Sequence, residues 1–244
     1  MNGIVPQKAS IREVYEAKSL AKITEQLLIS KNKKLSIAQI LNLHKILLSD
    51  INDGIAGRFR QGKEWVRIGN QLGANPLFAS SLMTELVKDY NAGKYPYFLD
   101  SIAYFHAEFE IIHPFCDGNG RIGRVIINQQ LMQLGYPPII IQNKSKVKEY
   151  YSLFSLYARN MKFDGFTALF ALLLIESLHK RLTYLTARRI IPLSLWAKQN
   201  EVKGNIATNK AKRQTIPAFR LREKWVISES YRENIDTIEF FHGK

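Results

Sequence analysis

Residues 98–134 hold the feature that most limits how this chain can fold: two helical segments joined by a loop rich in glycine. The first, FLDSIAYFHAEFEII (98–112), has apolar residues at helical spacing. Pro114 ends this helix and holds His113 at its C-terminal edge. After the glycines, the spacing predicts a second helix over 124–134, which GYPP stops. The pattern therefore predicts two helices with an ordered loop between them.

Helical spacing recurs through most of the first 186 residues, with one short hairpin expected at Glu64–Ile68. The further helices are expected over residues 10–29, 36–51, 76–90, 145–161 and 166–186.

Past Pro192 the pattern changes to two short helices, LSLWAKQN and NIATNKAKR, followed by an alternating, strand-like run with a turn near Leu221–Glu223. We therefore expect a mainly α protein with two domains, residues 1–186 and 187–244.

Charge gives the same division. The 244 residues carry a formal charge of +14. Lys180 to Lys224 alone hold twelve Lys or Arg against two Glu, a net charge of +10. Such an excess indicates a polyanionic partner, namely nucleic acid, nucleotide or an anionic surface. The alternative is simply a basic soluble protein.

The remaining composition predicts a cytoplasmic protein with no membrane contact. One cysteine, Cys116, cannot form an internal disulfide framework or a Cys-rich zinc site, which favours a reducing compartment. The N-terminal residues are polar and do not read as a signal peptide. The apolar run FTALFALLLIES (166–177) is too short to span a bilayer and is expected to be a core helix.

The loop HPFCDGNGRIGR (113–124) combines groups suited to phosphate chemistry. Backbone N–H groups of a Gly-rich turn that opens a helix bind anions. Arg121 and Arg124, three residues apart, project on one side and suit phosphate oxygens. Asp117 is a candidate Mg²⁺ ligand and His113 a candidate general base. The set predicts phosphoryl or nucleotidyl transfer.

A rival interpretation uses two Glu-x-x-His pairs, Glu110…His113 and Glu176…His179, as in di-iron helical bundles. Pro114 breaks the helix directly after His113, and a bundle metal site has no use for a Gly-rich loop. His44 and His106 lie in helical apolar patterns and are expected to be core histidines rather than ligands.

The loop resembles the signature of the Fic family, His-Pro-Phe-any-Asp/Glu-Gly-Asn-Gly-Arg-any-any-Arg, at every specified position. The resemblance covers residues 38–161. It includes a helix that holds His44, Gly-Arg-Phe-Arg at 57–60, a hairpin flap, the signature, GYPP, and Glu-Tyr-Tyr at 149–151.

This resemblance implies a Fic helical fold with a small β-hairpin flap, and transfer of AMP from ATP to a target hydroxyl. His113 would be the base and Asp117 the Mg²⁺ ligand. The implied phosphate-binding residues are Gly118, Asn119, Gly120, Arg121 and Arg124. Trp65, Val66, Arg67 and Ile68 would form the flap that aligns the target protein, although Trp65 could equally be an ordinary hairpin aromatic. Tyr150 and Tyr151 are candidates for the adenine end, with packing as the alternative role.

Many Fic proteins carry an inhibitory helix, Ser/Thr-any-any-any-Glu-Gly/Asn, whose Glu pairs with the second motif arginine, here Arg124. No stretch of this chain matches, and Glu233-Asn234 has Glu at position 229. The chain is therefore naturally unrestrained, inhibited by a partner that supplies the Glu, or shortened. The target protein, the nucleotide, the direction of transfer and the oligomeric state all stay open.

The C-terminal part resembles an excisionase-type or MerR-type winged helix-turn-helix, which implies DNA binding. The expected DNA-contacting residues are Asn209, Lys210, Lys212, Arg213, Arg220, Arg222 and Lys224. Docking of the target protein, or packing on the catalytic domain, are the alternatives. The second function left open is thus a DNA-bound regulator whose Fic domain binds nucleotide but turns over slowly.

Overall fold

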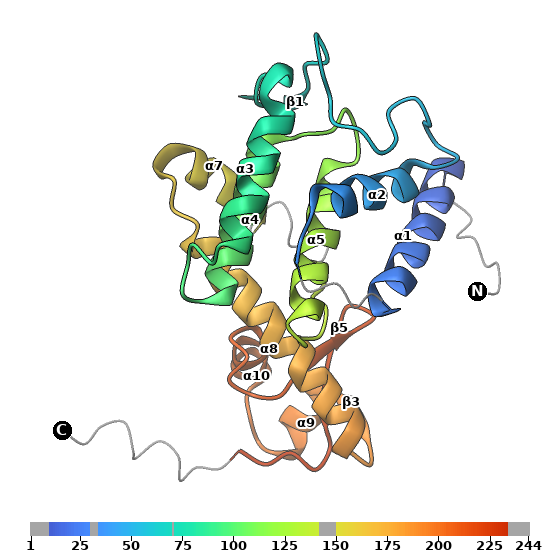
Figure 1. Cartoon of the computed structure of the whole chain (residues 1–244). Coiled ribbons are helices and arrows are strands. Elements are labelled where there is room, and N and C mark those ends of the chain that lie inside the picture. The colour runs from blue at the N-terminus through green and yellow to red at the C-terminus, as the bar shows by residue number, and fades with distance from the viewer. Residues whose placement is uncertain (1–9, 30–33, 70, 142–149, 234–244) are drawn as a thin grey trace. The chain divides into compact units, whose positions relative to one another are not determined.

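The computed structural model describes residues 10–29, 34–69, 71–141 and 150–233 (Figure 1). The chain divides into two compact units, residues 1–170 and 171–244. The boundary falls inside one long helix, α8 (Asp164–Thr186). In the described parts of the chain, no helix is long and apolar enough to cross a bilayer.

The first unit is built from helices around α4, which packs against α3, α5 and α7. Its core consists of apolar side chains from α1 to α5, among them Leu47, Phe105, Phe109 and Ile126. The elements are α1 (Ile11–Ile29), α2 (Ile37–Leu48), a 3-10 turn (Pro76–Phe78), α3 (Ala79–Asn91), α4 (Phe98–Ile112), α5 (Asn119–Gln133) and α7 (Tyr151–Asn160). Part of the helix expected over 145–161 lies outside the described residues.

The helix–loop–helix at the centre of this unit follows the expected order with one correction. α4 has the expected bounds, but α5 begins at Asn119, five residues before the expected start at Arg124. Gly118 precedes α5 in the left-handed region (φ 82°), which glycine adopts without strain. A Cβ on Gly118 would also lie 3.2 Å from Leu47 Cδ2. The loop thus turns directly into the helix, and both arginines lie in its first two turns.

The hairpin also lies slightly later than expected. Its strands are β1 (Arg67–Ile68) and β2 (Gln71–Leu72), which pair antiparallel. Glu64 belongs instead to a preceding turn, in which its carboxylate accepts from Arg58 at 2.7 and 2.8 Å and from the Gln61 N–H at 2.8 Å. This capture of Glu64 explains why the strand starts only after the turn.

The second unit contains the end of α8, two short helices and a three-stranded antiparallel sheet in the order β3-β5-β4. Trp196 and Ile216 lie in its core. Both expected short helices and the hairpin are present, with Arg222 and Glu223 in the left-handed region at the turn. The elements are β3 (Ile190–Pro192), α9 (Leu193–Gln199), α10 (Gly204–Lys212), β4 (Phe219–Leu221) and β5 (Lys224–Ser228). The sequence did not predict β3.

Candidate functional site

The loop between α4 and α5 is held in shape by its own polar side chain. Asn119 accepts the Phe115 N–H at 2.8 Å and donates to the Phe115 carbonyl at 2.7 Å. Phe115 is fully buried and stacks on the His44 ring, with centroids 3.7 Å apart. The Asn119 side chain is therefore occupied inside the loop. Any role toward phosphate falls to backbone N–H groups in the first turn of α5, such as those of Asn119 and Gly120. Of their neighbours, the Gly118 N–H donates to Asp117 Oδ1 at 2.6 Å and the Arg121 N–H donates to the Gly118 carbonyl at 3.1 Å.

His44 holds the part of the loop that contains Asp117. The Gly57 N–H donates to Nδ1 at 3.0 Å, so the ring proton is on Nε2, which donates to the Asp117 carbonyl at 3.0 Å. Burial lowers the pKa of His44 to about 4, and the ring stays neutral. His44 is thus a satisfied core histidine that positions Asp117, as its apolar sequence context indicated.

His113 lies where the loop leaves α4, and its backbone is left-handed (φ 51°). Its Nδ1 is 3.2 Å from the Glu110 carbonyl, which assigns the proton to Nδ1 and leaves the Nε2 lone pair available. Burial lowers the pKa of His113, so the neutral ring prevails at pH 7. These properties suit a general base.

Arg60 is a residue whose role sequence reasoning missed. Its side chain is almost fully buried. The guanidinium donates to the carbonyls of His113 at 2.6 Å and Ile112 at 2.8 Å, and also to that of Ala74 beside the hairpin. Arg60 therefore joins the end of α4 to the base of the flap. The only signal in the sequence was its place in Gly-Arg-Phe-Arg.

A cavity of about 610 Å³ opens beside His113. Gly120 and Arg124 line it together with His113, and Tyr150 and Tyr151 line it as well. The other lining residues are Ile68, Gly69, Leu72, Glu110, Ile111, Phe154 and Ser155. The structure thus gathers the expected base, one glycine of the loop, one arginine, both tyrosines and one flap residue around one space.

The two tyrosines differ. Tyr150 is buried and its hydroxyl lies 2.7 Å from His106 Nε2, whereas Tyr151 is half-exposed. Burial raises the pKa of the Tyr150 hydroxyl well above its usual value. Tyr150 therefore forms part of the buried cavity wall, and Tyr151 is the more exposed of the two tyrosines that line the cavity.

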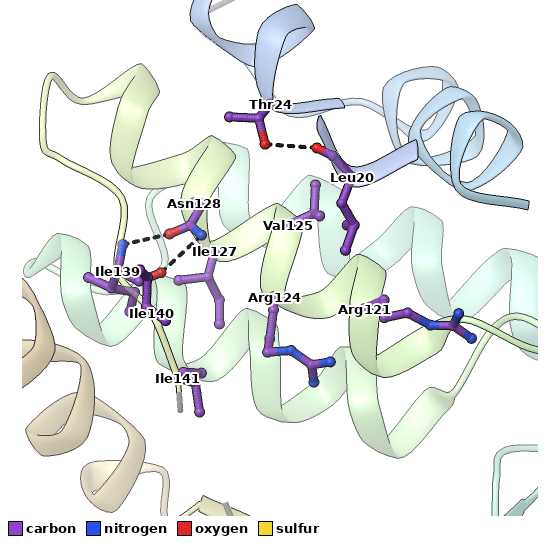
Figure 2. A pocket seen from close by; sticks show the side chains of 10 residues that line it. All are labelled: Leu20, Thr24, Arg121, Arg124, Val125, Ile127, Asn128, Ile139, Ile140 and Ile141. Carbon is purple, nitrogen blue, oxygen red and sulfur yellow. Dashed lines mark hydrogen bonds between the residues drawn. The ribbon is translucent and has the colours of Figure 1, made fainter. Parts of the chain in front are cut away.

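A second, smaller cavity of about 280 Å³ lies between α1, α5 and residues 139–141 (Figure 2). Arg121 and Arg124 lie along it, opposite apolar side chains such as Leu20. Asn128 holds its far edge through two hydrogen bonds to the Ile139 backbone, at 2.8 and 3.1 Å. Arg124 therefore lines both cavities.

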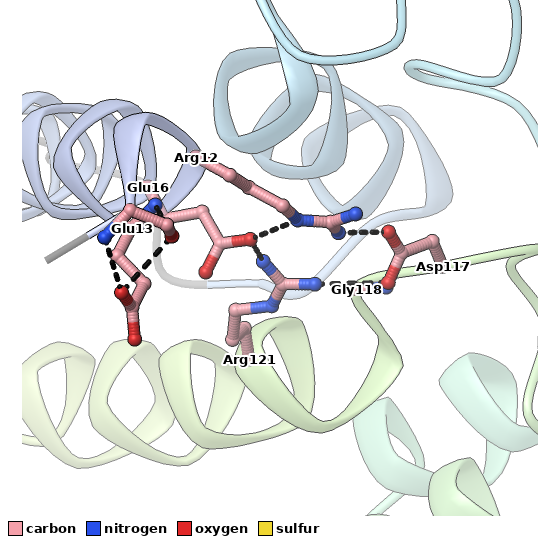
Figure 3. A network of polar contacts seen from close by, with 7 residues as sticks. Arg12, Glu13, Glu16, Asp117, Gly118 and Arg121 are labelled. Atoms are coloured by element: carbon pink, nitrogen blue, oxygen red, sulfur yellow. Dashed lines mark hydrogen bonds and ion pairs between the residues drawn. The ribbon is translucent and has the colours of Figure 1, made fainter.

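Asp117 and Arg121 are engaged by α1, as Figure 3 shows. Arg12 contacts the Asp117 carboxylate and donates to Glu16 at 2.8 Å, while Glu16 pairs with Arg121. Arg121 also contacts Asp117 at 2.9 Å. The four side chains alternate in charge and close into a ring. No sequence pattern indicated Arg12 or Glu16.

Asp117 has the properties of a ligand for a divalent cation. Burial alone would raise the pKa of its carboxyl, but hydrogen bonds from Arg12 and the Gly118 N–H lower that pKa overall. The side chain is 35 % exposed and already surrounded by positive groups. Among the described residues there is no cluster of three metal-binding side chains. Because Arg12 and Arg121 already pair with the carboxylate, Mg²⁺ could bind Asp117 only together with substrate phosphates and after these contacts open.

The other expected flap residues, Trp65, Val66 and Arg67, are not among those that line the larger cavity. The Val66 carbonyl accepts the Gly73 N–H at 3.1 Å, and Arg67 pairs with Leu72 across the hairpin. Trp65 precedes the strand and is 51 % exposed. Ile68 is the one expected flap residue that lines the cavity.

The expected DNA-contacting residues fall into two groups. Arg220 pairs with Glu176 at 2.7 Å and lies over the Trp225 ring, and Lys210 pairs with Glu233 at 2.5 Å. These two side chains are therefore already paired within the second unit. The exposed members are Asn209, Lys212, Arg213, Arg222 and Lys224. Glu176 and His179 of the rival di-iron interpretation are likewise engaged, the latter with Gln214 at 2.9 Å.

Comparison with known proteins identifies the central region. Residues 34–131 match the model of the Fic/DOC family, and they form a Fic/DOC domain. The protein adenylyltransferase Fic of Aedes aegypti is 33% identical over 126 residues, which are 50% of this chain and 25% of that protein. The chain thus spans about a quarter of the length of the curated relatives it matches.

Solved structures agree on the fold. A Fic domain containing signaling protein from Bacteroides thetaiotaomicron aligns with a TM-score of 0.65 at 25% identity, over 75% of this chain and 76% of that one. Fic-1 from C. elegans (residues 134–508) gives a TM-score of 0.65 at 26% identity, over 75% of this chain and 55% of that one. The chain is thus mainly helical with a small antiparallel sheet, as in the Fic fold.

Proposed function

We propose that this chain is a protein adenylyltransferase, which moves AMP from ATP to a Ser, Thr or Tyr hydroxyl of a target protein. The observation that carries the proposal is the cavity of about 610 Å³, where His113, Gly120 and Arg124 meet an apolar and aromatic lining. A base and anion-binding groups at one part of a cavity, with aromatic rings at another, suit a nucleotide. The name of the insect relatives supports AMP as the transferred group.

In this proposal His113 acts first. Its Nε2 takes the proton of the target hydroxyl, and the oxygen attacks the α-phosphorus of ATP. The bond from that phosphorus to the bridging oxygen of the β-phosphate breaks, and pyrophosphate leaves. The Nδ1–H keeps its hydrogen bond to the Glu110 carbonyl throughout, so Nε2 stays on the side of the ring away from that carbonyl.

The phosphates would be held by the start of α5. N–H groups around Gly118 and Gly120 would bind oxygens at the reacting phosphorus, where negative charge develops. Arg121 would hold the β-phosphate and Arg124 the γ-phosphate. Asp117 would hold Mg²⁺, which neutralises phosphate charge. Since Arg12 and Glu16 occupy Asp117 and Arg121, these contacts must open first.

Tyr151 would pack near the adenine, and the flap hairpin would pair with an extended target segment. A regulatory partner could place a carboxylate in the smaller cavity beside Arg124. Another nucleotide, such as UTP, or removal of AMP would use the same groups and is tested beside ATP.

The proposal is tested by the intact mass of the purified chain after incubation with Mg²⁺ and ATP. We expect a gain of one adenylyl group on the chain or on an added target, absent in His113→Ala. Glu85→Gln, an exposed change on α3, is the matched control and should behave like the native chain. ATP binding without transfer in any mixture, including cell extract as the source of targets, would contradict the proposal.

A second candidate function rests on the C-terminal unit. Its element order, with α10 followed by the β4–β5 hairpin, and its exposed cations suit a winged helix that binds DNA. Lys212, Arg213, Arg222 and Lys224 would contact phosphates. Affinity for random-sequence DNA should then fall steeply with salt, with a shallower slope in Lys212→Gln/Arg213→Gln. Equal binding by both proteins would refute this role.

A further inference from the structure

Glu110 and His113 lie one turn apart at the end of α4, and the structure turns their side chains toward each other. The left-handed backbone of His113 brings its ring back over the last turn of the helix. Nδ1 then lies 3.7 Å from Glu110 Oε2, in addition to its 3.2 Å contact with the Glu110 carbonyl. The Glu-x-x-His spacing therefore does bring the two side chains together, but in the proposed transfer site rather than in a di-iron site.

The Glu110 carboxyl occupies a space that the fold leaves for it. Its side chain is 9% exposed, and Oε1 is buried without a hydrogen-bond partner. A Cβ at Gly123 would lie only 2.4 Å from that oxygen, so the carboxyl depends on glycine at this position. A buried carboxyl that lacks a full set of partners is costly, which calls for an explanation beyond packing.

The charged and titratable groups around the pair come from several elements. On α4, His106 is fully buried and neutral, with its pKa lowered to about 3 by burial. Arg124 faces Glu110 from α5, Tyr150 faces it from the start of α7, and Arg60 faces His113 from the preceding loop. Within the described residues, His113 is the one group at ion-pair distance from the Glu110 carboxyl.

We propose that Glu110 is a positioning residue for the transfer reaction, whose carboxylate stabilises the imidazolium that forms when His113 takes the target proton. The proton moves from the target hydroxyl to Nε2, the Nδ1–H stays in place, and Glu110 itself gains and loses no proton in the step. This inference rests on the proposed transfer function, because it assigns His113 as the base.

The charges of Glu110 and His113 both change with pH. Burial raises the pKa of Glu110 to about 7, although the charge of Arg124 opposes this, whereas burial lowers the pKa of His113. The competent pair, an ionised Glu110 beside a neutral His113, therefore accumulates as the pH rises through 7. Glu110 rather than His113 then sets the acid limb of the rate, and the two groups titrate as a coupled pair.

The first test needs no catalysis. The chain has five histidines, and in protein with ¹³C-labelled histidine the His113→Ala variant identifies the His113 signal. In the native chain we expect that signal to titrate in two steps, one of them near pH 7 and shared with Glu110. In Glu110→Gln it should titrate in a single step at lower pH. One identical step in both proteins would overturn the proposal, whether or not the chain transfers AMP.

The second test follows AMP transfer against pH. We expect Glu110→Gln to transfer about 10-fold more slowly at pH 8 and to lose the limb near pH 7. Glu110→Asp should restore part of both, and Glu85→Gln should match the native chain. A slower Glu110→Gln that keeps the native limb would mean a merely structural role and refute the proposal. If the native chain transfers nothing while the two-step titration is present, the proposed function fails and the proton coupling stands.

Discussion

Arg121 and Arg124 lie one helical turn apart at the start of α5, yet their surroundings differ. Arg121 is 19% exposed and is held by Glu16 and Asp117. Arg124 lines both cavities (Figure 2), and no ion pair holds it among the described residues. The loop is thus neutralised by α1 at its Arg121 end and available to a ligand at its Arg124 end. Two arginines of one motif need not contribute equally to binding.

The largest expected effect on nucleotide binding is that of replacing Arg124. Arg124→Ala should weaken Mg²⁺-ATP binding about 100-fold, because a bidentate charge-assisted contact contributes roughly 2–3 kcal/mol. Arg121→Ala should weaken it only about 10-fold or less, because binding at Arg121 must first break its pair with Glu16. Calorimetric titration of both variants measures the difference. Equal losses would remove the asymmetry.

His44 stabilises the loop before α5, because its ring donates a hydrogen bond to the Asp117 carbonyl. Its folded pKa of about 4 lies below the ordinary value of 6.5. The stability that neutral His44 contributes is therefore present above pH 6.5 and lost as the pH falls toward 4. The loss should be about 3 kcal/mol for this side chain. Urea unfolding of His44→Gln at pH 7.5 and 4.5 should show a smaller drop than the native chain. The same drop in both would assign the acid sensitivity elsewhere.

These features divide between those that local sequence predicts and those that it does not. The bounds of α4 follow from apolar spacing and Pro114, both local signals. The start of α5 was misplaced because a left-handed Gly118 lets the loop turn straight into the helix. The ring of Arg12, Glu16, Asp117 and Arg121 joins residues about a hundred positions apart, and exposed charges on a helix carry no pattern that specifies a distant partner.

The smallest expected effect is that of removing the contacts of α1 with Asp117 and Arg121. Arg12→Ala/Glu16→Gln should strengthen Mg²⁺-ATP binding by about 3-fold, since partly exposed ion pairs contribute only about 0–1 kcal/mol. Glu13→Gln is the matched control, because Glu13 lies on the same helix but bonds Ser10 rather than the loop. Unchanged or weaker binding in the double variant, measured by the same titration, would mean that α1 does not compete with the nucleotide.

The position of the transferred label distinguishes AMP transfer from phosphoryl transfer. The native chain and His113→Ala are incubated with Mg²⁺ and with ATP labelled either at the α-phosphate or at the γ-phosphate. We expect the native protein to retain the α-label but not the γ-label, and the His113 variant to retain neither. Retention of the γ-label, or of the α-label without His113, would contradict this expectation.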